Sequence, residues 1–393
     1  EETREQWNSK WGFILAAIGS AVGLGNIWRF PYVLYSSGGG AFFIPYFCAI
    51  FTAGIPLLIL EYGMGHKFRG STPRCMNKIN PKFEWIGWWP IISSSVILCY
   101  YSMILSWTLK YSLLSFKKSW GSDADSFFYK DFLQLSSSPT SFNKLVIPVA
   151  VGIFVVWFIN WLVCYNGVKK GVETTSKVLL PILFAIMFFI VIRSVTMEGA
   201  VKGLNVLFEP NWATLKNPQI WISAYGQVFF SLSIATGIMM TYSSYLPEKT
   251  DINNSAFMTA FANCGFEFLS AIGVFAILGV MATMQDVPVD QVVSSGIGLA
   301  FIAFPNIFSQ MGAWGNILGV MFYICLGFAG ITSSVSLTEA ISAAIKEKMN
   351  IDRKKIVTVM SLIGCAISMA FATDAGLYLL DIMDSFINNY GIV

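Results

Sequence analysis

Two stretches of small and hydroxyl-bearing residues interrupt otherwise apolar runs of this sequence. One is Gly19–Asn26 (GSAVGLGN) and the other is Ser231–Gly237 (SLSIATG). Glycine costs about 1 kcal/mol in a helix interior, and serine and threonine compete for backbone hydrogen bonds. Both stretches therefore predict helices that unwind in the middle. Unwound backbone offers carbonyl groups to a cation and amides to an anionic group such as a carboxylate.

A third group of oxygen atoms lies in a later apolar run. Ala329, Thr332 and Ser333 stand at positions i, i+3 and i+4, so one carbonyl and two hydroxyls can share a helical face. Neutral oxygen ligands suit a hard cation such as Na⁺. Two alternatives stay open: the hydroxyls bond their own backbone, and the small residues of the two stretches serve only close helix packing.

Five charged residues fall inside apolar runs, where an ionised group is costly and usually functional. They are Arg29, Glu61, Glu267, Glu339 and Asp384. The alternative for Glu61 is a structural role, in which its carboxyl group accepts a hydrogen bond from unwound backbone.

The composition indicates whether the surface of the protein faces water or lipid. Hydrophobic residues make up 55% of the 393 residues and charged residues 12%, whereas a soluble domain has about a quarter of its residues charged. Much of the surface must therefore face lipid. A net charge of +3 gives no reason to expect a nucleic-acid partner. The single histidine, His66, and seven scattered cysteines provide no metal or catalytic constellation, so an enzyme is not expected.

Ten apolar segments are long enough to span a bilayer. They cover approximately 11–35, 40–64, 86–115, 145–164, 172–192, 218–245, 254–283, 313–345, 355–372 and 375–393. A further apolar stretch, 293–309, is predicted to be a hairpin lying on the protein. Two groups of five spans (approximately 11–192 and 218–393) are inverted relative to each other, and the interrupted segments are the first of each group. We therefore expect an all-α polytopic membrane protein with a single transporter domain over residues 1–393, built from two inverted five-helix repeats with helices 1 and 6 interrupted.

The loops determine the expected orientation. With a cytoplasmic N-terminus, most of the 25 Lys and Arg residues lie on the inner side, as the positive-inside rule requires. We expect a multi-pass protein of the cell membrane, in contact with the lipid bilayer. The sequence makes no prediction of the oligomeric state.

Five strings resemble the neurotransmitter:sodium symporter family, in its bacterial branch that transports hydrophobic amino acids. They are GSAVGLGNIWRFP (Gly19–Pro31), GGGAFFIP (Gly38–Pro45), GQVFFSLS (Gly226–Ser233), AGITSS (Ala329–Ser334) and LDIMD (Leu380–Asp384). The resemblance runs from about Arg4 to the end of the chain. Family members have eleven or twelve spans, so the C-terminal spans are expected to be missing from this sequence.

The resemblance implies a symporter that uses two Na⁺ ions to import neutral, hydrophobic amino acids by alternating access. It also implies chloride independence, with proton antiport as an option. Two alternatives stay open: a sodium-coupled carrier of another small solute, and a relative that does not transport and acts as a sensor or scaffold.

The resemblance also assigns site residues. The first sodium site would use Ala21, Asn26, Ser231 and Asn263. The second would use Gly19, Val22, Ala329, Thr332 and Ser333. The substrate would contact Ala21, Leu24, Gly25, Ile97, Tyr101, Phe230, Ser231, Ser233, Thr236, Ser333 and Leu337. Gly23 would leave room for a substrate carboxylate, because monoamine transporters carry an aspartate there. Ala235 and Thr236 depart from the family pattern, which leaves the identity of the substrate open.

Further assignments concern ions and gates. Glu267 would stand where chloride binds in animal members, beside Tyr46, Gln227 and Ser231. Arg29 and Asp384 would form an outer gate, and Arg4 with Glu347, supported by Trp7 and Tyr245, an inner gate. The Gly171–Pro181 spacing is the one at which the family unwinds its fifth helix; the alternative is a simple proline kink.

Overall fold

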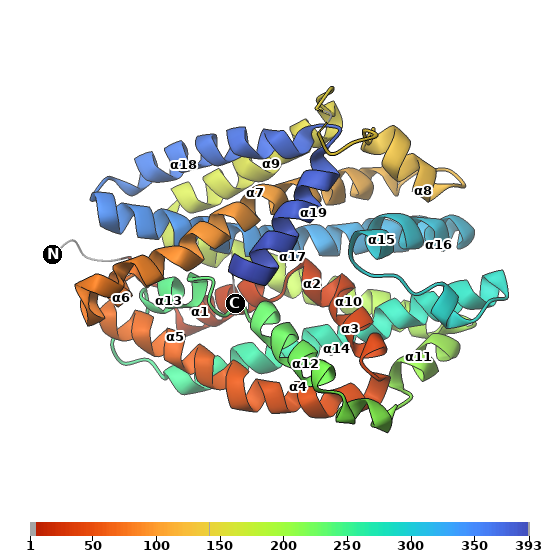
Figure 1. Cartoon of the computed structure of the whole chain (residues 1–393), viewed down its shortest axis with the longest axis horizontal. Coiled ribbons are helices and arrows are strands. Elements are labelled where there is room, and N and C mark those ends of the chain that lie inside the picture. Colours follow the sequence, from red (N-terminus) through yellow and green to blue (C-terminus); the bar gives the residue numbers. More distant parts are fainter. Residues whose placement is uncertain (1–4, 141, 392–393) are drawn as a thin grey trace.

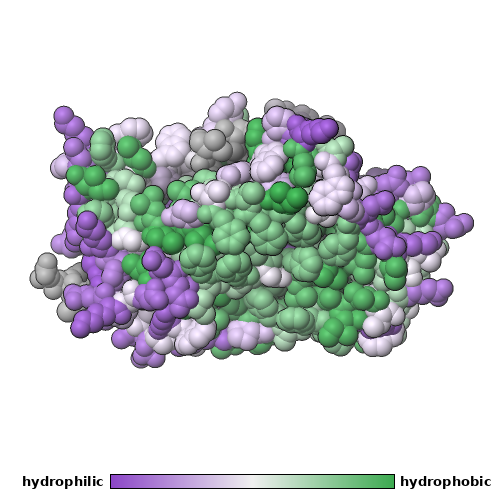
Figure 2. All heavy atoms as spheres, turned by 90° about the horizontal axis from the view of Figure 1, so that it is seen from below, coloured by the Kyte–Doolittle hydropathy of each residue, from purple (hydrophilic) through white to green (hydrophobic). Residues whose placement is uncertain are grey.

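The computed structural model describes residues 5–140 and 142–391, and this part of the chain is almost entirely helical. Seven helices in it are long and apolar enough to cross a membrane, or eight if the bent pair Lys10–Ala21 and Leu24–Ser36 is one span. A broad apolar band covers the middle of the surface, and hydrophilic residues gather at its two ends (Figure 2). The predicted all-α membrane fold is confirmed.

The seven continuous spans include several in which the helix type changes without a break. They are η1–α4–η2–α5 (Gly39–Phe68), η3–α7 (Pro81–Leu114, with α7 at Glu84–Leu114), α9 (Ile147–Tyr165), η5–α10 (Val168–Val195), α14 (Ile252–Gln285), α17 (Gly312–Met349) and α18–η9 (Arg353–Ala372). The short connecting helices include α6 (Thr72–Ile79), α8 (Ala124–Ser126), α11 (Ala200–Phe208), α15 (Gly296–Gly298) and α16 (Phe304–Gln310).

Three of the ten expected spans are not single long helices. The first is α1 (Lys10–Ala21), α2 (Leu24–Trp28) and α3 (Phe30–Ser36), with a 55° bend at the first break. The sixth consists of α12 (Pro218–Ser231) and α13 (Ile238–Ser243), each too short to span alone. The tenth is α19 (Gly376–Phe386), which continues as a π-helical turn to Gly391. Both predicted interruptions are therefore present.

The interrupted helices lie inside the bundle. Figure 1 shows α1, α2 and α13 between two rows of helices, with α7, α9 and α18 above them in the view and α4 and α5 below. The first helix packs against α10, α14 and α17, and most of its residues are buried. This position removes the broken backbone from lipid, as a membrane requires of backbone that is not hydrogen-bonded within a helix.

The stretch 293–309 is helical rather than a hairpin. It forms α15, η8 (Leu299–Ala303) and α16, which together are too short to be a span. The ring of Phe301 packs against Trp107, Tyr111 and Phe128, with centroid distances of 5.6, 5.0 and 5.6 Å. The expectation that this segment lies on the protein is met, and an aromatic cluster holds it there.

Candidate functional site

The first break is two residues long. After α1 ends at Ala21, Val22 and Gly23 are extended, and α2 begins at Leu24. The Asn26 side chain accepts a hydrogen bond from the Gly23 amide at 2.9 Å, and the Leu24 amide donates to the Tyr101 hydroxyl at 3.5 Å. These two bonds cap α2 at its first turn.

Gly23 provides the room at this break. A Cβ atom there would lie 3.1 Å from the Ser333 hydroxyl and 3.5 Å from the Tyr101 hydroxyl. Any side chain at this position would therefore fill the space between α2, α7 and α17. This space is where the resemblance places a substrate carboxylate.

The second break is longer and adopts a less common backbone. Leu232–Gly237 is not helical, and Ser233, Ala235 and Gly237 have φ angles of +53°, +62° and +81°. For residues with a Cβ atom this region costs about 1–2 kcal/mol. Ala235, which replaces the usual glycine, therefore holds a conformation that glycine would adopt without that cost.

Two side chains satisfy the backbone of the second break. The buried Glu61 carboxylate accepts a hydrogen bond from the Ala235 amide at 2.7 Å, and Ser94 donates to the Thr236 carbonyl at 2.9 Å. The structural role left open for Glu61 is thus present in its geometry. Ser94 carried no sequence signal, because a serine in an apolar helix usually bonds its own backbone.

The two breaks meet at a backbone carbonyl. Ser233 at the second break and Ser333 on α17 both donate to the Ser20 carbonyl, each at 3.3 Å. Ser20 was not among the predicted residues, because every residue has a backbone carbonyl and the residue type does not show which carbonyl is used.

The side chains predicted for the first sodium site come together from three helices. The Asn26 amide donates to the Asn263 side-chain oxygen at 2.8 Å and lies 3.4 Å from the Ser231 hydroxyl. Asn263 on α14 also donates to Ser231. All three side chains are buried, as is Ala21 at the end of α1. The cluster therefore offers neutral oxygen atoms only.

The residues predicted for the second sodium site lie where α1 faces α17. The Thr332 hydroxyl is 3.0 Å from the carbonyls of Phe328 and Ala329, and the Ser333 hydroxyl is 3.1 Å from Ala329. A Cβ atom on Gly19 would lie 3.4 Å from Thr332. Gly19 and Thr332 are thus direct neighbours, and Val22, the buried residue that directly follows α1, comes three positions after Gly19.

The predicted substrate residues border both breaks. A Cβ atom on Gly25 would meet the Phe230 ring at 2.8 Å, so this ring covers the first turn of α2. Thr236 donates to the Ser233 carbonyl at 2.7 Å, which occupies its hydroxyl inside the second break. Ile97 is half-buried on α7, and Leu337 is buried on α17.

Glu267 lies one helical turn beyond Asn263 on α14. Its carboxylate accepts hydrogen bonds from the Tyr46 hydroxyl and, at 2.7 Å, from the Gln227 amide. The side chain is fully buried. A further side-chain hydrogen bond joins Glu267 to Ser231, so the structure brings together the acid and all three neighbours that the sequence assigned to it.

The predicted outer gate is not joined by an ion pair. The Arg29 guanidinium lies 4.6 Å from the centroid of the Phe230 ring, a cation–π distance. Asp384 instead accepts a hydrogen bond from the Tyr100 hydroxyl at 2.8 Å. Within residues 5–140 and 142–391, no ion pair links Arg29 to Asp384.

The predicted inner gate is partly assembled. The buried Trp7 donates through its indole to the Tyr242 carbonyl at 2.7 Å and through its backbone to the Tyr245 carbonyl at 3.1 Å. Glu347 accepts from the Ser71 amide and hydroxyl at 2.9 and 2.7 Å. Arg4 lies outside the described residues.

Sequence reasoning missed the acid Glu173 at this end and named no partner for Glu339. Glu173 is buried and accepts hydrogen bonds from the Asn8 amide and the Ser9 hydroxyl, at 2.7 and 3.2 Å. Glu339, noted only as a charge in an apolar run, forms a two-point ion pair with Arg353. Asn8 is 165 positions from Glu173 and Arg353 is 14 positions from Glu339, so neither contact corresponds to a short helical spacing.

The fifth span is helical through the Gly171–Pro181 segment. Gly171 lies in the π-helix η5 (Val168–Glu173), and α10 continues through Pro181. The unwinding that the resemblance implied is not present in this structure.

Comparison with known proteins agrees with this geometry. The model of the "Sodium:neurotransmitter symporter family" matches residues 4–124 and 118–393. An uncharacterized sodium-dependent transporter of Methanocaldococcus jannaschii is 41% identical over 387 residues, which cover 98% of this chain and 79% of the relative. This chain belongs to the sodium:neurotransmitter symporter family.

Other members of this symporter family are also similar. The sodium-dependent dopamine transporter of Caenorhabditis elegans is 30% identical over 100% of this chain and 72% of its own length. A solved structure of MhsT in complex with L-phenylalanine has a TM-score of 0.78 at 30% identity, covering 99% of this chain and 91% of that chain. The predicted membership is confirmed, and the protein is a sodium-dependent membrane transporter rather than an enzyme.

Glu61 provides a test of how the second break is held. In Glu61→Gln the side-chain carbonyl can still accept the Ala235 amide, so stability should stay close to that of the wild type. In Glu61→Leu a buried N–H loses its partner, which should lower the free energy of unfolding by about 1–3 kcal/mol. Thermal unfolding of the purified variants in detergent measures the difference. Equal unfolding temperatures for the leucine and glutamine variants would contradict this role of the carboxylate.

Proposed function

We propose that this protein is a sodium-coupled symporter that imports neutral amino acids with an apolar side chain. The observation that carries the proposal is the cluster of Asn26, Ser231 and Asn263, which collects neutral oxygens beside the unwound end of α1. A sodium ion bound there would lie close to a substrate carboxylate in the space left by Gly23. The substrate would thereby complete the ion's coordination, which couples the two.

Two sodium ions take part in the proposed cycle. The first would be held by Asn26, Ser231, Asn263 and the carbonyl of Ala21. The second would bind between α1 and α17, at the hydroxyls of Thr332 and Ser333 and the carbonyls of Gly19, Val22 and Ala329. The proximity of Gly19 to Thr332 supports this second site.

The proposed substrate has an α-carboxylate and an apolar side chain. The carboxylate would reach the Leu24 and Gly25 amides and the Tyr101 hydroxyl. The side chain would lie among Ile97, Phe230 and Leu337, with Ala21, Ser231, Ser233, Thr236 and Ser333 around it. The complex of MhsT with L-phenylalanine, a relative of the same fold, supports this class of substrate.

The gates alternate access to that site. Arg29 and Asp384 would approach each other above Phe230 when the outer side closes, and Arg4 with Glu347, braced by Trp7 and Tyr245, would close the inner side. We propose that the repeats 11–192 and 218–393 move against each other in this exchange. The Arg and Lys residues around the α17–α18 turn gather at the end where Glu5 lies, which supports a cytoplasmic N-terminus in the cell membrane.

The substrate class can be tested directly. Proteoliposomes with an inward sodium gradient should accumulate radiolabelled phenylalanine, leucine or a similar neutral amino acid, and potassium in place of sodium should abolish accumulation. Competition by a panel of the common amino acids would rank side chains. Sodium-dependent binding without accumulation would instead indicate a sensor, and a panel without any competitor would indicate another solute.

The second sodium site predicts a specific loss. Thr332→Ala combined with Ser333→Ala removes two oxygen ligands, so the sodium concentration for half-maximal uptake should rise about tenfold or more. Thr338→Ala is the matched control, because its buried hydroxyl on the same helix bonds only the Ser334 carbonyl. Wild-type sodium activation in the double variant would remove this site from the mechanism.

Glu267 makes transport independent of chloride in this proposal. A carboxylate beside the first sodium supplies a fixed negative charge, and a chloride ion within a few ångströms of it would be repelled strongly at low dielectric. We propose that the same carboxyl group takes up a proton when the empty carrier returns, which gives proton counter-movement.

Chloride replacement tests this role. Wild-type uptake should be unchanged when gluconate replaces chloride, whereas Glu267→Ser should lose uptake about tenfold or more in gluconate and recover it in chloride. Glu267→Gln is the control, since its neutral side chain fills the space and should not respond to chloride. A serine variant that ignores chloride, or a wild type that requires it, would disprove the substitution.

A further inference from the structure

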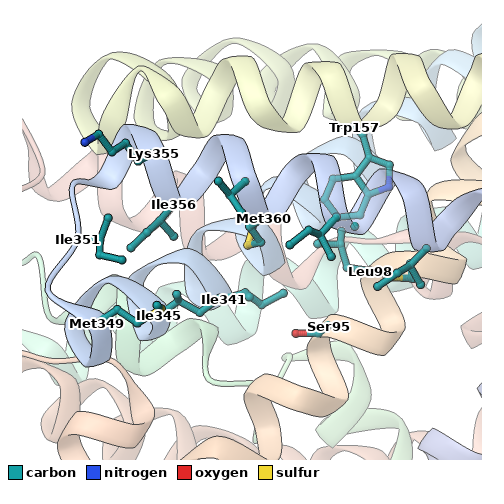
Figure 3. Close-up of a pocket in the computed structure, with 15 residues that line it drawn as sticks. Ser95, Leu98, Trp157, Ile341, Ile345, Met349, Ile351, Lys355, Ile356 and Met360 are labelled. Atoms are coloured by element: carbon teal, nitrogen blue, oxygen red, sulfur yellow. The ribbon is translucent and has the colours of Figure 1, made fainter.

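A groove of about 490 Å³ lies on the side of the bundle, between α7, α17 and α18, and none of its lining residues belongs to either break. Figure 3 shows its residues in a row, from Lys355 and Ile351 at one end to Leu98 and Trp157 at the other. Only two of its lining residues, Ser95 and Lys355, carry a hydroxyl or a charge. The groove is therefore suited to a hydrocarbon chain rather than to a soluble ligand.

The groove opens on the apolar outer surface of the bundle. Val359, Ile363 and Ile367 on α18 each leave more than half of their side chain exposed in this apolar region. The floor is formed by Trp157 of α9, whose indole donates to the Ser368 hydroxyl at 3.0 Å. A Cβ atom on Gly364 would overlap the Trp157 ring, so this glycine allows α18 to lie close to the floor.

The length of the groove matches one leaflet of a bilayer. Its residues on α18 run from Lys355 to Ile367, a helical rise of about 18 Å. Half of the hydrocarbon core is about 15 Å. Arg353, two residues before Lys355, is paired with Glu5 at 3.7 Å. The charged end of the groove is thus on the side of the chain's N-terminus.

Lys355 stands at that end without an acidic partner among the residues described. The neighbouring cations are engaged: Arg353 binds Glu339, Lys354 lies 5.1 Å from the centroid of the Tyr165 ring, and Lys348 is 2.7 Å from Glu84. Asp352 caps α18 by accepting the Lys354 amide. An ammonium group at the mouth of an apolar groove, level with the lipid headgroups, is complementary to a phosphate.

We propose that this groove is a binding site for an anionic phospholipid of the leaflet on the N-terminal side. One acyl chain lies along α18 between Met360 and Ile345, and the headgroup phosphate pairs with Lys355. The bound lipid connects α17, which carries Thr332 and Ser333, to α18. None of the residues that line the groove is among those proposed to contact the transported solute, and the proposal does not depend on the function proposed above.

The test is native mass spectrometry of the full chain in detergent, titrated with phosphatidylglycerol or with phosphatidylcholine carrying the same acyl chains. The wild type should bind phosphatidylglycerol about fivefold more tightly, the factor expected from one basic residue near an anionic membrane surface. Lys355→Gln should abolish this preference and keep the weaker binding of phosphatidylcholine. Met360→Trp should fill the groove and lose both lipids.

Two matched controls separate this site from general effects. Lys170→Gln removes an exposed cation at the same end of the protein, and Leu362→Trp adds the same bulk on an α18 residue that does not line the groove. Both should bind lipid as the wild type does, and unfolding temperatures without lipid identify any misfolded variant. Equal affinity of the wild type for the two lipids, or a preference that survives in Lys355→Gln, would overturn the proposal. A wild-type dimer that Met360→Trp dissociates would also overturn it, by showing that a second copy fills the groove.

Discussion

The need to satisfy broken backbone away from water determines this architecture. In hydrocarbon, an amide or carbonyl group without a partner costs several kcal/mol, so a helix can unwind only where other groups replace its lost bonds. At the first break Asn26 and Tyr101 do this, and at the second break Glu61 and Ser94 do. Since these groups come from α2, α7 and α5, the breaks can exist only at the centre of the bundle. The carbonyls that remain are then available to ions.

The buried charges follow from the same constraint. Glu339 is paired with Arg353, and Glu267 is held by Tyr46 and Gln227, so each of these two buried acids has more than one donor. Arg29 rests on an aromatic ring and Asp384 on a tyrosine hydroxyl. Arg29 and Asp384 thus each contact a neutral partner. Breaking such a contact costs less free energy than breaking a buried ion pair.

The sequence was informative where residue type itself carries the signal. Glycines and hydroxyls in apolar runs located both breaks, and an acid in a membrane helix marked Glu61 and Glu267 as partners of something polar. The resemblance then placed Asn26, Ser231 and Asn263 in one cluster, although they are up to 237 positions apart.

The sequence could not predict contacts made by backbone atoms or contacts between residues far apart in the chain. Packing between helices determines which groups bond to the Ser20 carbonyl, the Ser94 hydroxyl and the Glu173 carboxylate. Such packing produces no periodic pattern in the sequence. The helical Gly171–Pro181 segment shows the same limit, because a spacing that permits unwinding does not determine whether the helix is unwound.

The hydrogen bonds that Glu173 accepts from the segment before α1 limit how the inner side of the protein can open. This single carboxylate holds the backbone just before α1 and also belongs to the π-helical turn that begins the fifth span. If the start of α1 moves away while the turn stays wound, Glu173 loses the Asn8 and Ser9 donors and keeps only Lys177. If the turn unwinds first, the start of α1 loses the carboxylate that holds it. Each movement therefore makes the other easier, and the two segments should open as one cooperative unit with a shared barrier. Forms in which only one of the two segments has opened would then be short-lived.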